Sequence, residues 1–470
     1  MPKHKASPGY RWAREHVLKS SAATAAWMFQ VKLEESQWYS ANQHLAYQTK
    51  RLGELLRHAK TNVPFYATAY KSADIDVSRD PDPATWRRIP LLTRAALQGN
   101  KAALTAARVP PDHGKSIAVA SSGSTGTPVE ALATELTGTW NRALTLRAQL
   151  WALKRFDYRL AVIRRYPNKV ADYPAGRSLP AWENEITLPV VSGPVFSLAA
   201  TTPTTEQVEW LNRHRPEVLL TYPSIFAGLL DAAASGELKL PGLRRILTIS
   251  EMLADEVRVA ARRTLGVEIF DAYSANETGS IALQCPEGHG YHVQSEALVV
   301  EVLHDDGRPC GPGETGRVVV TLLHNYALPL IRYEIGDFAT VGRQCRCGRG
   351  LPVLTRIIGR QRNMLIGPKG ERSRPALGWK YIKGMAPITQ GQFIQHTIEK
   401  LEAKLVVARP LVEAEEARVR ELLTSRMPQF SEVVFTYVEE LPRSEGGKFE
   451  DFISLVGKPS PTADKGAARS

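Results

Sequence analysis

At 470 residues the chain is longer than one ordinary hydrophobic core, so we expect a large body with at least one smaller domain. Hydrophobic residues make up 43% and charged residues 23%, close to the average of globular proteins, and no apolar run reaches the roughly 20 residues that span a bilayer. No long apolar stretch follows the basic N-terminus as a secretory signal requires. The composition therefore predicts a cytoplasmic protein with no membrane partner.

The net charge of +12 is concentrated at the two ends of the chain. Residues 1–20 contribute +4, from five Lys/Arg against one Glu, and residues 457–470 contribute +2, from three Lys/Arg against one Asp. No stripe of Lys/Arg interleaved with aromatic residues lies between them, so we expect no specific nucleic-acid partner.

The first predicted elements are helical and are followed by strands. After a basic N-terminal segment of residues 1–35, apolar residues recur at helical spacing from Ser36 to Lys60, and Asn62-Val63-Pro64-Phe65-Tyr66 ends this pattern with a turn. Short β-branched or apolar runs then alternate with helical stretches, which predicts an α/β body with buried strands at Ile117–Ala120, Val218–Leu220, Ile246–Ile249, Val267–Phe270 and Val318–Leu322.

The C-terminal third adds β structure and a small domain. His292–Leu303 and Gly316–His324 bracket Asp305-Asp306-Gly307, which predicts a hairpin within an added β subdomain. Beyond it, a helical stretch lies between two strand-like runs, which predicts a small α+β domain of Leu405–Ala408, Val412–Arg426 and Glu432–Val438. We expect a large domain at 36–362, a hinge near Asn363, a small domain at 363–456 and a disordered tail at 457–470.

A loop rich in hydroxyl groups and glycine is the first candidate site, and it comprises Ser121, Ser122, Gly123, Ser124, Thr125, Gly126, Thr127 and Pro128. Its hydroxyls and main-chain N–H groups can surround phosphate oxygens. It is no Walker loop, because it lacks the Gly-Lys-Ser/Thr ending and Val129–Ala133 continues as a strand. A plain Ser/Gly turn is the alternative interpretation.

Three further segments carry candidate residues. Tyr273 and Glu277 follow the strand Val267–Phe270, where an aromatic ring can stack on a purine and a carboxylate can hold Mg²⁺, although an ordinary polar loop is possible. Asp337 follows the strand-like run from Leu330 and could accept hydrogen bonds from ribose hydroxyls. Lys448 lies in a glycine loop and, taken alone, reads as a surface lysine.

In this order the segments resemble the adenylate-forming superfamily, and within it the phenylacetate–CoA ligase-like and CapK-like branch, from about residue 36 to residue 455. Other phrases typical of that branch are Asn62-Val63-Pro64-Phe65-Tyr66, Ile89-Pro90-Leu91-Leu92-Thr93-Arg94, Tyr222-Pro223-Ser224, Ser250-Glu251 and Cys345-Arg346-Cys347-Gly348-Arg349. The resemblance implies a large adenylation body with a small mobile α+β domain. It also implies that a carboxylate attacks the α-phosphorus of Mg·ATP, that pyrophosphate leaves, and that a thiol or amine then takes the acyl group. We expect the acceptor to be the thiol of CoA or of a carrier protein.

The resemblance assigns roles to individual residues. Ser121 to Thr127 would hold the β- and γ-phosphates, Asn276 would sit near the α-phosphate, and Glu277 would hold Mg²⁺. The adenosine site would comprise Ser250, Glu251, Ala272, Tyr273 and Ser274, with Asp337 and Arg360 at the ribose. Lys448 would reach the α-phosphate when the small domain closes. Asn276 departs from the usual Thr or Ser, and Asn363 replaces the acid or lysine usual at the hinge.

The cysteines suggest a structural zinc site. Zinc prefers four N/S ligands, and Cys285, Cys345 and Cys347 with His289, or with His292 as the alternative, supply such a set. Comparable Cys/His sets occur in the same branch, where the metal would pin the β subdomain, while buried reduced cysteines are the alternative. We expect Cys310 to be a turn residue and no ligand.

Acceptor and acid are less constrained by the sequence. An adenylating amide synthetase with an amine acceptor is the alternative enzyme, and a non-catalytic, zinc-containing basic binding module is the alternative from another class. The joint presence of Glu277, Asp337, Arg360 and Lys448 argues against the binding module. We expect an aromatic acid, because the stretch from Thr139 to Trp151 and the segment near Tyr222 could wall an acyl pocket, although a core helix is the favoured interpretation of the former.

Overall fold

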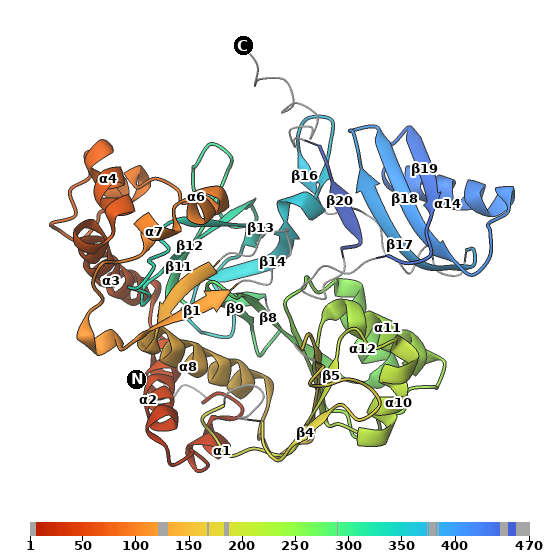
Figure 1. The fold of residues 1–470 in the computed structure, drawn as a ribbon, viewed down its shortest axis with the longest axis horizontal. Coiled ribbons are helices and arrows are strands. Elements are labelled where there is room, and N and C mark those ends of the chain that lie inside the picture. The colour runs from red at the N-terminus through yellow and green to blue at the C-terminus, as the bar shows by residue number, and fades with distance from the viewer. Residues whose placement is uncertain are drawn as a thin grey trace. The chain divides into compact units, whose positions relative to one another are not determined.

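The computed structural model describes residues 6–120, 130–166, 169–182, 188–288, 290–373, 375, 382, 385–441 and 450–456 (Figure 1). These residues form two compact units, with the boundary between Ile357 and Ile358. We call them the first unit and the second unit and describe each by itself. None of the described helices combines the length and hydropathy that a membrane-spanning segment needs.

Helices form the N-terminal part of the first unit. They are α1 (Tyr10–Arg14), α2 (Ser21–Ser36), α3 (Ala41–Asn62) and α4 (Pro64–Ser72). The Ser20 hydroxyl caps α2, and Ser40 forms a capping box with Gln43 at the start of α3. The helical prediction from Ser36 is confirmed from Ala41 onward, but the turn expected at residues 62–66 is confined to Val63, because Pro64 is tolerated in the first turn of α4.

Short elements lead to the helix α8. They are α5 (Pro83–Arg88), α6 (Arg94–Gly99), α7 (Lys101–Leu104) and the 3-10 helix η1 (Pro111–His113). The strands β1 (Ser116–Ala120) and β2 (Glu130–Thr134) pair antiparallel and form a sheet of their own. The capping side chain of Thr134 then starts α8 (Glu135–Ala152), whose C-terminal half is buried.

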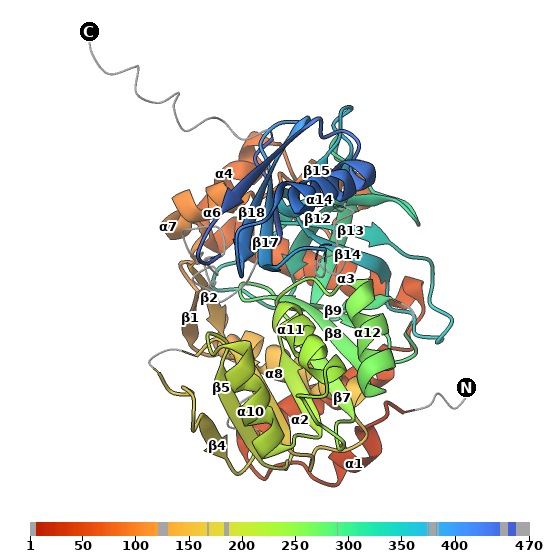
Figure 2. The same cartoon turned by 90° about the vertical axis from the view of Figure 1, so that its right-hand side faces the viewer.

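Helices cover both faces of a parallel sheet at the centre of the first unit (Figure 2). Its strands are β3 (Leu160–Arg164), β5 (Val195–Ala199), β6 (Val218–Thr221), β7 (Arg245–Ile249) and β8 (Glu268–Ala275), with β4 (Arg177–Leu179) antiparallel at the edge. Successive side chains of a strand point to opposite faces. Leu219 and Ile246 accordingly pack with α10 (Thr204–His214), α11 (Pro223–Ala234) and α12 (Asp255–Leu265), whereas Leu220 and Leu247 pack with α8.

The predicted β region is confirmed, and it continues the same sheet. From its edge the order is β11 (Leu298–Leu303), β12 (Thr315–Leu322), β13 (Tyr333–Val341), β14 (Val353–Arg360), β10 (Tyr291–Val293), β9 (Gly279–Gln284) and then β8. The hairpin of β11 and β12 is as predicted. The single run expected at His292–Leu303 is instead two strands, because the chain turns at Gln294, whose carbonyl accepts from the N–H groups of Ala297 and Leu298.

The second unit is the small α+β domain predicted from the sequence. It contains η2 (Gln361–Asn363), β15 (Leu365–Ile366), β16 (Arg372–Ser373), β17 (Ile388–Gln395), β18 (Lys400–Val407), α14 (Glu413–Arg426), β19 (Glu432–Tyr437) and β20 (Phe452–Ser454). The larger sheet has the order β19-β18-β17-β20. Apolar side chains of α14, such as Val419 and Leu423, bury one face of it against Leu401 and Leu405.

Candidate active site

Tyr273 and Asp337 lie together, as the nucleotide interpretation requires. The Tyr273 hydroxyl donates to Asp337 Oδ2 at 2.7 Å. The predicted local structure was wrong at both positions. β8 continues through Tyr273 because β9 pairs with it there, and Asp337 lies inside β13, beside residues that pair with β12. Strands distant in the sheet order thus bring a ring and a carboxylate to one place.

Glu277 occupies the turn between β8 and β9 and is buried, with 8% of its surface exposed. Tyr333 donates to Glu277 Oε1 at 3.4 Å, and Arg94 Nη1 lies 3.9 Å from the same oxygen. Both contacts are long for a buried carboxylate. The neighbouring Asn276 is exposed. The turn therefore presents an exposed amide and a buried acid whose described contacts are weak.

Arg94 was not assigned a role from the sequence, although its motif was noticed. Leu92 makes two backbone hydrogen bonds at the start of β13, accepting from Glu334 and donating to Arg332 just before the strand, each at 2.9 Å. The buried Arg332 also donates to the carbonyl of Ile89 at 2.7 Å. These hydrogen bonds hold the segment from Ile89 to Arg94 beside β13. Its last residue, Arg94, lies next to Glu277. Only the folded chain reveals this pair, since no local pattern links a helix start to a distant turn.

The predicted adenine segments meet at the ends of neighbouring strands. Ser250 and Glu251 directly follow β7, and Ala272 on β8 pairs with Ile249 at the end of β7. The Glu251 carboxylate accepts from the Ser224 N–H at 2.9 Å, which joins the Tyr222-Pro223-Ser224 phrase to Ser250-Glu251. Carboxyl ends of parallel strands are where open α/β sheets bind ligands. Ser274 lies one residue beyond Tyr273 on β8.

A buried carboxylate supports β8 from within the sheet and was missed in the sequence. Asp271 accepts from the Thr248 hydroxyl at 2.5 Å and from the Tyr291 hydroxyl at 2.7 Å. Arg258 in turn donates to Tyr291 at 2.9 Å. Burial raises the pKa of Asp271 above its usual range, although these hydrogen bonds and Arg258 oppose the shift. The sequence signal for this residue was an acid, Asp271, next to apolar residues of a strand.

Other predicted residues are not brought together by the described structure. Ser121 to Thr127, Lys448, His289 and the tail 457–470 lie outside the described residues. Arg360 ends β14 in the second unit, so its pairing with Asp337 stays a prediction. Within the second unit, the Asn363 amide donates to Glu450 Oε1 at 3.2 Å and to the Phe452 carbonyl at 2.7 Å.

The cysteine cluster contains four candidate ligands. Cys285, His292, Cys345 and Cys347 place their donor atoms within 4.8 Å of one another. The Sγ atoms of Cys285 and Cys345 are 3.7 Å apart, and Cys347 Sγ is 3.3 Å from His292 Nε2. Three thiols and one imidazole suit tetrahedral zinc. The histidine in the group is His292, named as the alternative to His289.

The titration behaviour of the cluster reflects its close contacts. Hydrogen bonds from Cys285 and then His292 lower the pKa of Cys347 to about 2, whereas burial raises the pKa of Cys345. His292 Nδ1 lies 3.4 Å from the Leu351 carbonyl, which leaves Nε2 facing the sulfur atoms. Such an outer hydrogen bond is the usual way of orienting a histidine ligand.

Side chains next to the cluster hold the N-terminal segment. Arg349 Nε donates to Gln37 Oε1 at 2.8 Å, and its guanidinium lies over the rings of Trp38 and Trp151 at 4.7 Å each. The Gly350 N–H donates to the Gln37 carbonyl at 3.0 Å. The segment that follows Cys347 therefore contacts the junction of α2 and α3.

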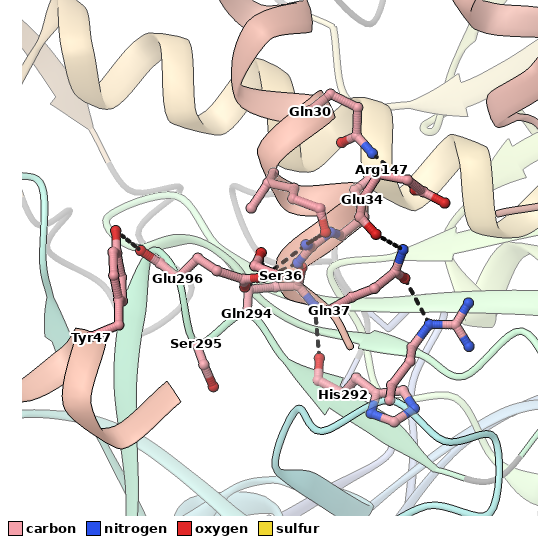
Figure 3. A network of polar contacts seen from close by, with 12 residues as sticks. Gln30, Glu34, Ser36, Gln37, Tyr47, Arg147, His292, Gln294, Ser295 and Glu296 are labelled. Carbon is pink, nitrogen blue, oxygen red and sulfur yellow. Dashed lines mark hydrogen bonds and ion pairs between the residues drawn. The ribbon is translucent and has the colours of Figure 1, made fainter. Parts of the chain in front are cut away.

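A buried polar network continues from His292 toward α2 and α8 (Figure 3). Gln294 donates to the His292 carbonyl at 2.8 Å and accepts from Arg147 at 2.9 Å. Arg147 donates to both oxygens of Glu296, at 2.9 and 3.1 Å, and the Ser36 hydroxyl donates to Glu296 at 2.5 Å. Burial opposes ionisation of Glu296, but the charge and hydrogen bonds of Arg147 outweigh it and lower the pKa.

Comparison with known proteins gives concordant matches. The family model for AMP-binding enzymes matches residues 181–322, and that for the CapK C-terminal domain matches residues 366–454. Phenylacetate-coenzyme A ligase of Escherichia coli (strain K12) is 26% identical over 345 residues, covering 71% of this chain and 75% of the relative. The Thermus thermophilus protein of the same name is 25% identical over 282 residues, covering 54% and 63%.

The fold is also found among solved structures. A crystal structure of 2-hydroxyisobutyryl-CoA ligase with 2-HIB-AMP aligns with a TM-score of 0.67 at 17% identity, covering 87% of this chain and 88% of that one. The fold and the AMP-binding match define an adenylate-forming enzyme. Within that superfamily the chain is similar to the phenylacetate–CoA ligases and has a CapK-type C-terminal domain, and it is an AMP-forming acid ligase.

Proposed function

We propose that the protein activates an aromatic carboxylic acid with ATP and transfers the acyl group to CoA. In the first step a carboxylate oxygen attacks the α-phosphorus, and the bond to pyrophosphate breaks. In the second step the thiol sulfur attacks the acyl carbon, AMP leaves, and the thiol proton passes to solvent. The phenylacetate-coenzyme A ligases among the relatives favour an aromatic acid and CoA over the amine acceptor.

The environment of Glu277 carries this proposal. A buried carboxylate is costly unless a cation or hydrogen bonds compensate it, and the described contacts of Glu277 are 3.4 and 3.9 Å long. A single carboxylate shared with phosphate oxygens is the arrangement that Mg²⁺ favours in nucleotide sites. We infer that Glu277 would hold Mg²⁺, which would neutralise charge on the phosphates, while Asn276 would donate to the α-phosphate.

Neighbouring residues would place the nucleotide. Tyr273 would stack on adenine while Asp337, fixed by the Tyr273 hydroxyl, accepts from the ribose together with Arg360 as donor. Ser250, Glu251, Ala272 and Ser274 would line the adenine, and Ser121 to Thr127 would hold the β- and γ-phosphates. Lys448 would approach the α-phosphate when the small domain closes. The bonds of Asn363 to Glu450 and Phe452 favour a pivot before residue 363.

The metal cluster has a structural role in this proposal. Cys285, Cys345, Cys347 and His292 would bind one Zn²⁺, which closes the loop around Arg349 and so holds the α2–α3 junction. Metal analysis checks this directly, and Cys345→Ser should remove that zinc. Retention of the full zinc content by Cys345→Ser would contradict the assignment.

The direct test of the function is pyrophosphate release from Mg·ATP across matched aryl and aliphatic acids. We expect release with an aryl acid, and acyl-CoA formation when CoA is added. Parallel reactions with a carrier protein or an amine test the other acceptors. No pyrophosphate with any acid would overturn the proposal, and product with an amine but not CoA would replace it by an amide synthetase.

A further inference from the structure

A second group of possible metal ligands lies in the hairpin between β11 and β12. His304, Cys310 and Glu314 place one donor atom each within 4.8 Å of the others. His304 Nε2 and Glu314 Oε2 are 3.1 Å apart. Cys310, expected from the sequence to be a plain turn residue, is thus beside an imidazole and a carboxylate. None of the three belongs to the nucleotide site or to the cluster at Cys285.

Backbone hydrogen bonds hold each of these residues. The Cys310 N–H donates to the Val302 carbonyl at 2.8 Å, and the His304 N–H donates to the Arg308 carbonyl at 2.9 Å. The Glu314 N–H donates to the Gly311 carbonyl at 3.0 Å, and its carboxylate accepts from the Gly311 N–H at 2.6 Å. The donor atoms are therefore carried by an ordered loop, which lowers the entropy cost of bringing them together.

Gly316 leaves the space that the thiol occupies. A Cβ atom at this position would lie 2.6 Å from Cys310 Sγ, and also 2.4 Å from the Leu303 carbonyl oxygen. Any larger residue would push the sulfur from its place. The absence of a side chain at Gly316 thus leaves room for the Cys310 thiol beside His304 and Glu314.

We propose that this hairpin binds Zn²⁺ through His304 Nε2, Cys310 Sγ and a Glu314 oxygen, with water as the fourth ligand. Zinc bonds of about 2.0–2.3 Å put tetrahedral donor atoms about 3.3–3.7 Å apart, so the separations here need only small side-chain rotations. The mixed nitrogen, sulfur and oxygen set suits zinc, whereas Mg²⁺ and Ca²⁺ prefer oxygen ligands alone.

Binding changes the protonation of two groups. The Cys310 thiol becomes a thiolate and releases one proton to solvent. In the hydrogen bond to Oε2 the proton sits on Nε2, because a carboxylate only accepts. On binding, that proton passes through solvent to Nδ1, and the Nε2 lone pair binds the metal in place of the hydrogen bond. The three ligands lie in the connection between the edge strand β11 and β12, so bound zinc would hold this hairpin closed.

The test compares zinc content per chain in the full-length protein and in Cys310→Ser after equilibration with free Zn²⁺ and removal of the excess. We expect the variant to hold about one zinc fewer per chain, whatever the cluster at Cys285 binds. His304→Gln should lose the same equivalent, and its partly exposed position in the hairpin keeps the test open if Cys310→Ser fails to fold. With Co²⁺ as the probe, the thiolate-to-metal absorption of Cys310→Ser should be weaker than that of the unchanged protein, by the contribution of the Cys310 thiolate.

The second unit offers a matched control. His396 Nε2 lies 2.8 Å from Glu402 Oε2 across the turn between β17 and β18, the same atom pair, but all four cysteines lie before the second unit. His396→Gln should keep the zinc content of the unchanged protein. Equal zinc in Cys310→Ser and the unchanged protein would overturn the site. An equal loss in His396→Gln would also overturn it, since any surface His/Glu pair would then account for the metal.

Discussion

Two glutamates of the first unit are almost equally buried and have opposite surroundings. Glu296, 4% exposed, receives two hydrogen bonds from Arg147, at 2.9 and 3.1 Å, and one from Ser36 at 2.5 Å. Glu277, 8% exposed, has contacts of 3.4 and 3.9 Å with Tyr333 and Arg94. Burial alone therefore does not identify a functional carboxylate. The length of its contacts separates an acid satisfied by the protein from one suited to a bound cation.

Their places in the fold explain the difference. Glu296 lies between β10 and β11 and contacts α2 and α8, so its network joins helices to the sheet. Glu277 lies in the turn at the end of β8, beside the residues of the proposed nucleotide site. The comparison predicts that changes near Glu277 reduce activity, whereas changes near Glu296 reduce stability.

The largest effect on activity is expected from Lys448→Ala. Adenylation should fall about a thousandfold, because a positive charge at the pentacoordinate phosphorus is lost, while transfer from preformed acyl-adenylate to CoA survives. Pyrophosphate release and thioester formation measure the two halves separately. Lys369→Ala, at an exposed lysine in a glycine turn of the second unit, is the control. Equal loss of both halves would make Lys448 structural.

Arg147→Met tests the opposite side of the comparison. The free energy of unfolding of the first unit should drop by about 3 kcal/mol, because Glu296 is left buried without its cation. Denaturant unfolding measures this, and adenylation per folded molecule should persist. Adding Glu296→Gln should restore part of the stability. A single variant as stable as the unchanged protein would contradict the structural role of the pair.

His324, which contacts Glu296, makes the stability of the structural region depend on pH. Its ring stacks on Trp140 at 4.2 Å, Nε2 lies 2.8 Å from the Glu296 carbonyl, and burial lowers its pKa to about 4. The unfolded chain therefore binds the proton more readily, so stability is complete above about pH 6.5 and is lost as pH falls toward 4. This group should cost about 2 kcal/mol between pH 7 and pH 5.

Replacing His324 by glutamine keeps a donor and removes the titration. The unfolding free energy of His324→Gln should therefore fall less steeply with decreasing pH than that of the unchanged protein. Denaturant unfolding at several pH values measures the two slopes. Identical slopes would show that His324 is protonated equally in both states.

Arg94→Ala should have the smallest effect of this series. Loss of its positive charge beside Glu277 should lower kcat/KM for Mg·ATP about tenfold, with little change in unfolding. Arg108→Ala, at an exposed arginine of the same N-terminal region, is the control. A loss of stability in place of activity would put Arg94 with the structural groups.

Local sequence patterns predicted elements better than they predicted contacts. The β-branched runs of β6, β7 and β12 were recognisable, and so was α14, because period and composition are local properties. α2 was not predicted, since several of its residues are alanine and its apolar stripe is weak. The end of β8 was misjudged because its extension depends on pairing with β9.

The residues of the candidate site also fall into those that local motifs predicted and those that only distant contacts reveal. Tyr273, Glu277 and Asp337 were predicted through ordered motifs. Arg94, Asp271 and the Arg147–Glu296 pair were missed, because their partners are distant in the sequence and the charge of each residue alone is unremarkable. Cys310 was dismissed for a similar reason, since His304 and Glu314 become its neighbours only when the hairpin closes.

The most direct test of the contrast is the Mg²⁺ dependence of acid-dependent pyrophosphate release at fixed ATP in Glu277→Gln and in the unchanged protein. We expect the variant to need about tenfold more Mg²⁺ for half-maximal rate, or to lose the reaction, while its unfolding is unchanged. The same Mg²⁺ dependence and rate in both proteins would contradict the assignment of Glu277 as the cation-binding carboxylate.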